Sequence, residues 1–195
     1  PHTAVLLVRS FGANVAITAA DAPDATTVEA AGSIAVDGAS NSIGTATAGT
    51  SLAMLARSGQ LTLGTGSAGT TATLTKQDAA GELQATTLTS GGDATIASST
   101  NTVLGSVESS GGNIVIDTVG ATSADTLTAS GLIDVDSGSA DIGTAAAGSS
   151  LTLLTRLGGL TLGAGSAGTT AVLTKQGATD ELDASVQLAG FFWLM

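Results

Sequence analysis

The sequence predicts an all-β chain that folds as a parallel β-helix, with coils of about 20 residues and near-zero helix content. Three observations lead to this fold class. Glycine followed by alternating apolar residues recurs along the chain, strand-like segments return about every 8 to 12 residues, and a long segment repeats at an offset of 99 residues. No window shows the apolar spacing and caps of a helix.

The glycine-led segments have the period-two alternation of a strand with one buried face. Glycine just before each strand is expected to supply a turn with a positive φ angle. These segments begin at Gly32, Gly59, Gly81, Gly92, Gly112, Gly131 and Gly158. Further short strands are expected between them, at residues 51–55, 71–74, 103–107, 150–154 and 170–173.

The chain consists of two tandem copies of one unit, about residues 1–99 and 100–195, and we expect them to form a single continuous solenoid. The stretch LTLGTGSAGTTATLTKQ at 61–77 recurs as LTLGAGSAGTTAVLTKQ at 160–176, and residues 31–85 match residues 130–184 at 35 of 55 positions. A sandwich or barrel needs different sequences at its edges and centre, whereas a β-helix stacks equivalent coils. Five coils of about 20 residues fit one unit.

The first copy of this stretch contains Gly64, Gly66 and Gly69 in the spacing of a dinucleotide-binding loop. That loop requires a helix to begin at its third glycine. The residues that follow Gly69 alternate and include several threonines, which favour a strand. We therefore predict a strand, a glycine-rich corner and a second strand, without a nucleotide site.

Composition excludes several classes of function. The chain has a net charge of −11 and only five Lys and Arg residues, so no basic stripe is available for nucleic acid. The early apolar run at residues 4–8 is too short for a membrane span. Aromatic residues make up 2% of the chain and cysteine is absent, which favours a regular core of small side chains.

Four glycine-led segments resemble the repeat regions of filamentous-haemagglutinin-like large exoproteins, the passengers of two-partner secretion. They are AGSIAVDG at 31–38, SGQLTLGTGSAG at 58–69, SGGNIVID at 110–117 and SGLIDVDSG at 130–138. The resemblance implies a right-handed β-helical shaft on the outside of a Gram-negative cell, where it supports adhesion or biofilm formation. The Asn-Pro-Asn motifs of that family's secretion domain are missing. The resemblance therefore places this chain in the shaft, which carries no catalytic residue and no cofactor.

Three aspartates, Asp37, Asp117 and Asp136, follow the second apolar residue of their strands, and we expect them to stack in one column with Asp134 nearby. These aspartates are candidates for calcium ligands, because calcium prefers oxygen donors. The glycine-rich nonapeptide pattern of calcium-binding β-helices is absent, so solvated turn carboxylates are the alternative. The candidates are Asp37, Asp117, Asp134 and Asp136.

Two basic residues recur in each unit, Arg57 with Arg156 and Lys76 with Lys175. Cleavage of a polysaccharide is one interpretation. They lack a neighbouring histidine or aromatic platform, so we expect no enzyme and instead expect these residues to protect strand edges or offset the acidic charge.

The two ends of the chain are unusually apolar. They are expected to cap the solenoid, to join copies end to end, or to mark a truncation boundary. The residues of this predicted contact are Val5, Leu6, Leu7, Phe191, Phe192, Trp193, Leu194 and Met195.

The leading functional hypothesis is a structural, non-catalytic shaft of a secreted surface adhesin, located outside the cell or on its surface. Its partners would be the rest of a longer exoprotein and glycans of host or bacterial surfaces. The first alternative is a self-assembling extracellular filament whose subunits stack end to end. The second is a β-helix that binds or cleaves polysaccharide.

Overall fold

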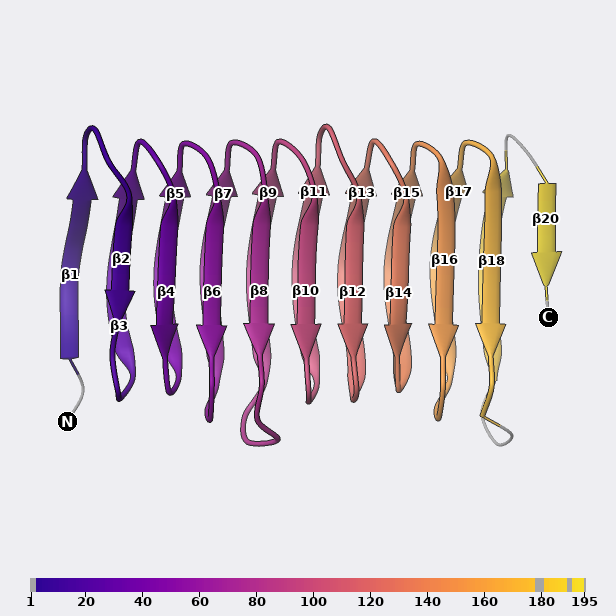
Figure 1. The fold of residues 1–195 in the computed structure, drawn as a ribbon. Coiled ribbons are helices and arrows are strands. Elements are labelled where there is room, and N and C mark those ends of the chain that lie inside the picture. Colours follow the sequence, from indigo (N-terminus) through magenta and orange to yellow (C-terminus); the bar gives the residue numbers. More distant parts are fainter. Residues whose placement is uncertain (1–2, 178–180, 189–190, 195) are drawn as a thin grey trace.

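The chain forms a two-sided parallel β-solenoid of about nine turns. The computed structural model describes the backbone of residues 3–177, 181–188 and 191–194, and the side chains of residues 7–177 and 181–187. Odd-numbered strands make one ten-stranded sheet and even-numbered strands make the other. The chain runs down the front and up the back while it advances from left to right in Figure 1, so the coil is right-handed. The described residues include no helix, and hence none that could span a membrane.

The strands of the first sheet have seven to nine residues. They are β1 (Thr3–Ser10), β3 (Pro23–Ala30), β5 (Asn41–Ala48), β7 (Leu61–Ala68), β9 (Leu83–Ser90), β11 (Thr102–Ser109), β13 (Ala121–Ala129), β15 (Ser139–Ala147), β17 (Leu160–Ala167) and β19 (Leu182–Leu188). The strands of the second sheet have four to six residues. They are β2 (Val15–Thr18), β4 (Ile34–Gly38), β6 (Leu52–Ala56), β8 (Ala72–Lys76), β10 (Ala94–Ser98), β12 (Ile114–Thr118), β14 (Ile133–Ser137), β16 (Ser150–Thr155), β18 (Thr170–Lys175) and β20 (Phe191–Leu194).

The lengths of the coils explain the 99-residue repeat. From β3 to β13, paired residues on successive odd strands are 18, 20, 22, 19 and 20 positions apart. These five coils make up one unit, and the series starts again with 18, 20 and 22 from β13 to β19. Coil length thus recurs with the sequence, and the prediction of coils of about 20 residues is confirmed.

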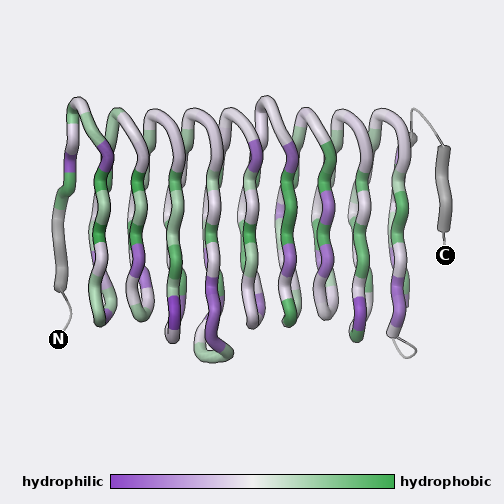
Figure 2. The backbone as a smooth tube through the Cα atoms, viewed as in Figure 1, coloured by the Kyte–Doolittle hydropathy of each residue, from purple (hydrophilic) through white to green (hydrophobic). Residues whose placement is uncertain are grey.

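Figure 2 shows hydrophobic residues alternating with more polar ones along the strands. The inward apolar residues form one core. In β8, for example, Ala72 and Leu74 are buried while Thr73 and Thr75 are partly exposed. The long strands interrupt this alternation with two successive outward residues, such as Gly44 and Thr45 in β5. The core consists of leucine, isoleucine, valine and methionine together with many alanines, and it contains no aromatic side chain among the described residues.

Glycine is needed at the corners for a reason other than the predicted one. Among the described residues only Gly81 has a positive φ, of 78°, so the expected positive φ is confirmed at Gly81 and is wrong at the other glycines that precede strands. The glycines instead allow close stacking of coils. A Cβ on Gly69 would lie 2.1 Å from the carbonyl oxygen of Gly49, and one on Gly91 would lie 2.0 Å from that of Gly69.

The glycines that have the spacing of a dinucleotide-binding loop, Gly64, Gly66 and Gly69, are likewise explained by close packing. A Cβ on Gly64 would meet the Gly44 carbonyl oxygen at 2.3 Å, and one on Gly66 would meet leucine methyl groups of the core. Strand β8 follows Gly69, as predicted, in place of a helix.

Candidate functional site

The aspartates predicted to stack do share one column of the second sheet. Asp117 and Asp136 are paired neighbours on β12 and β14. Asp37 occupies the same column on β4, but its neighbours there are Thr18 and Leu55, and three strands separate it from β12. Asp134 lies two positions before Asp136 and is paired with Val115. The structure therefore brings three of the four candidates together.

The arginines that recur in each unit bind these aspartates. Arg57 donates to Oδ2 of Asp37, and Arg156 donates to Oδ2 of Asp136. Nη2 of Arg156 also lies 3.7 Å from Oδ1 of Asp117. The pairs of Arg57 with Asp37 and of Arg156 with Asp136 join adjacent coils, whereas Arg156 and Asp117 lie two coils apart. Because a guanidinium group already neutralises these carboxylates, their arrangement suits the joining of coils better than the binding of a cation.

The described residues contain no group of three or more histidine, cysteine or acidic side chains that could hold a metal ion. The Oδ1 atoms of Asp37 and Asp136 are buried, and neither has a hydrogen-bond partner within the part of the chain described. Asp37 and Asp136 occupy equivalent positions in the two units, 99 residues apart. Calcium binding remains a prediction that the contacts of Asp37 and Asp136 do not favour.

Asp134 has a perturbed environment. Burial raises the pKa of its carboxyl group, and the neighbouring Asp136 carboxylate raises the pKa further. The first unit has Ala35 at the equivalent position. Asp134 is therefore an acidic group that the fold does not require.

Replacing Asp134 by alanine, the residue of the first unit, is expected to stabilise the protein at pH 7 by less than about 1 kcal/mol. A raised pKa in the folded state means that the contribution of Asp134 to stability falls as the pH rises through the interval from the unfolded to the folded pKa. The gain should therefore disappear at about pH 3, where the carboxyl group is protonated in both states. Urea unfolding of both proteins at the two pH values measures this, and a gain that is equal at both would contradict the electrostatic explanation.

The expectation that the recurring basic residues protect strand edges is wrong for Lys76. Its side chain is only 2% exposed. It occupies the last inward position of β8, where the neighbouring strands place Ala56 and Ser98. The Lys76 ammonium group donates to the carbonyl oxygen of Asp78. Burial lowers the pKa of Lys76, and the charge of Asp78 opposes this shift.

Lys76 supports an extended turn of the first unit. Lys76 begins the connection of the 22-residue coil, which projects below β8 in Figure 1. The hydroxyl group of Ser99 donates to the same Asp78 carbonyl at 2.6 Å. Lys175 repeats the arrangement by donating to the carbonyl of Gly177. The sequence contained a signal for this burial: Lys76 follows Ala72 and Leu74 at a period of two, so it faces inward like them.

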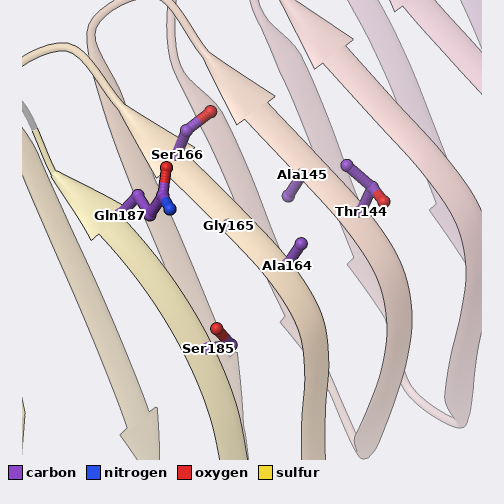
Figure 3. A pocket seen from close by; sticks show the side chains of 7 residues that line it. All are labelled: Thr144, Ala145, Ala164, Gly165, Ser166, Ser185 and Gln187. Carbon is purple, nitrogen blue, oxygen red and sulfur yellow. The ribbon is translucent and has the colours of Figure 1, made fainter.

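The outer face of the first sheet carries shallow hollows between strands. One of about 280 Å³ lies over β15, β17 and β19 (Figure 3). Ala164 faces outward with a short side chain, while Ala145 and Gly165 face the core and line the hollow with backbone. Its other lining residues are Thr144, Ser166, Ser185 and Gln187. None of these side chains titrates near neutral pH, so the hollow offers polar contacts and no acid or base.

The apolar ends lie only partly within the described residues. Val5 and Leu6 belong to β1, and Leu7 in the same strand is 54% exposed. Phe191, Phe192, Trp193 and Leu194 form β20, which pairs with β18. Met195 lies outside the described residues. Strands β1 and β2 are the outermost strands at one end of the two sheets, and β19 and β20 are the outermost strands at the other end.

Comparisons with known proteins identify no relative: no protein-family model, no curated protein and no solved structure matches the chain.

Proposed function

We propose that this chain is a length of rigid, non-catalytic shaft from a secreted adhesin of a Gram-negative surface, and that its role is to hold other parts of a longer exoprotein at a distance. The observation that carries the proposal is the in-register stacking of ten strands in each sheet. Parallel strands at about 4.8 Å spacing give the nine intervals a length of roughly 43 Å.

The use of charged residues supports a structural role. Arg9, Arg57 and Arg156 each bind a carboxylate of the preceding or following coil, and Lys76 and Lys175 bind backbone carbonyls of their own turns. All five basic side chains thus stabilise the coil. None is grouped with an acid and a base around a hollow, which is what cleavage of a polysaccharide requires.

The repeat supports a role in setting length. Because the series of coil lengths restarts after 99 residues, another unit can be added without changing any register. Adhesion would then depend on other parts of the exoprotein, including those that recognise glycans on host or bacterial surfaces.

Labelling of cells tests the location. An antibody raised against the purified chain is expected to bind intact cells of the bacterium that produces it, and protease added outside the cells should remove the label. A signal that appears only after the cells are permeabilised would contradict secretion.

Measurement of length tests the shaft role. A protein with one additional 99-residue unit should form rods about 24 Å longer, since five coils are added. The purified chain is expected to bind no sugar on a glycan array. Binding of a sugar by the chain itself would show that the chain recognises glycans, and this would contradict a role as a spacer alone.

A further inference from the structure

The middle of the chain contains a junction between its two units. The coil of β9 and β10 stacks on the coil of β11 and β12, with Leu83 paired to Thr102 and Leu88 paired to Val107. In the other sheet Ala94 is paired to Ile114. This contact is a complete coil-to-coil interface whose geometry is known.

The two ends of the rod repeat the two sides of this junction. Strand β1 begins at Thr3, which is 99 residues before Thr102, and β2 begins at Val15, which is 99 residues before Ile114. Strand β19 begins at Leu182, which is 99 residues after Leu83. The first coil is thus the counterpart of β11 and β12, and β19 begins as the counterpart of β9. Strand β20 departs from β10, because its pairing with β18 has a spacing of 21 residues where β8 and β10 have 22, so Phe192 takes the place of Ala94. The first and last coils lie at opposite ends in Figure 1.

A glycine in the first coil provides an independent observation. Gly111 lies in the turn after β11, where a Cβ would be 2.4 Å from the carbonyl oxygen of Gly91 in the preceding coil. Its counterpart in the first unit is Gly12, where a Cβ would have nothing within 4 Å. The first coil therefore keeps a residue that only a preceding coil makes necessary.

The open edges agree with such a contact. In the sheets described, β1 and β2 have a neighbour on one side only, and so do β19 and β20. Neither edge has the proline, lysine or inward charge that usually blocks pairing with another strand.

We propose that separate copies of residues 1–195 stack end to end, with β1 and β2 of one copy adding in parallel to β19 and β20 of the next, as the coils stack at the internal junction. Leu182 then pairs with Thr3, and Asp183 with Ala4. Strand β19 has seven residues and its pairing with β17 shifts between Leu162 and Gly165, so beyond this shift Gln187 pairs with Arg9. A contact between unlike ends does not close, and it therefore produces filaments.

A Gly12→Val variant tests the contact. A Cβ at Gly12 meets nothing within 4 Å in one copy and Gly12 has no positive φ, so the variant is expected to fold with nearly the stability of the parent chain. In a stack it would strike the preceding copy. Sedimentation velocity over a range of concentrations at about 0.15 M salt, which screens the acidic charge, should show association of the parent chain and its loss in the variant. A parent chain that stays monomeric, or a variant that associates equally, overturns the proposal.

Cross-linking tests the register. The chain contains no cysteine, and paired strands place Cα atoms at a distance that a disulfide can span. Ala4→Cys combined with Asp183→Cys should give a ladder of covalent oligomers on oxidation. The matched control, Ala4→Cys with Gln187→Cys, places the cysteines out of register and should give few. Equal ladders from both pairs would contradict the proposed register.

Discussion

A Gly69→Ala variant is expected to lose about 3 kcal/mol of stability, although Gly69 is exposed. Exposed positions normally tolerate alanine, but here the added Cβ would lie 2.1 Å from the Gly49 carbonyl oxygen and 3.0 Å from its carbon. The obstacle is backbone that is itself held by hydrogen bonds to the next coil, such as the one from the Gly69 amide to the Ala48 carbonyl at 3.0 Å. The stack must open or the turn must shift.

Gly66→Ala is the matched control three residues away. Its Cβ would approach Leu63 and Leu88 methyl carbons, at 2.7 and 2.9 Å, and the ends of leucine side chains can rotate. The paired residue in the preceding coil is Ala46, so this column already accepts alanine. We expect a loss of about 1 kcal/mol or less, measured as the urea midpoint by circular dichroism. Equal losses in the two variants would show that close approach of coils is not what requires glycine at the corner.

The second large effect is expected at a corner whose residues differ between the units. Gly38 is buried, and a Cβ on it would lie 2.5 Å from Cδ of Pro23 and 2.7 Å from Oδ1 of Asn41. At the equivalent positions the second unit has Ser137, Thr122 and Ala140. Gly38→Ser alone is therefore expected to cost about 2 to 3 kcal/mol, because the rigid proline ring cannot move away.

Adding Pro23→Thr and Asn41→Ala to Gly38→Ser should recover most of this loss, because the three residues then match the second unit. The hydroxyl groups of Thr122 and Ser137 are buried without hydrogen-bond partners among the described residues, so recovery is expected to remain incomplete. Unfolding of the single variants, of Pro23→Thr with Asn41→Ala, and of the triple variant gives the coupling energy. If the losses simply add, the corner does not act as one packed group.

Much of the fold follows from local patterns. The alternation in segments such as Ile34–Gly38 and Ala72–Lys76 sets which side chains point inward, because strands place successive residues on opposite faces. The 99-residue repeat required coils of equal design. The stacking of Asp117 and Asp136 followed from their equal distances from the start of the strand.

Other features depend on contacts between coils that no local pattern contains. The partners of Asp37 and Asp136 are arginines 20 residues away, and only the register shows that these side chains meet. The unequal coil lengths, from 18 to 22 residues, likewise depend on how each turn packs against the one before it.

The sequence by itself determined the strands, the parallel solenoid, the length of the repeat and the absence of a basic surface, because alternation, repetition and charge are properties of the linear chain. Only the tertiary structure decided that Lys76 is buried. It also decided that glycine is needed at the corners because a Cβ there would collide with a carbonyl oxygen of the neighbouring coil, and that nearly all of these glycines have no positive φ. The reason is physical: burial and steric contact in a solenoid arise between residues about 20 positions apart, and they exist only once the coils are stacked.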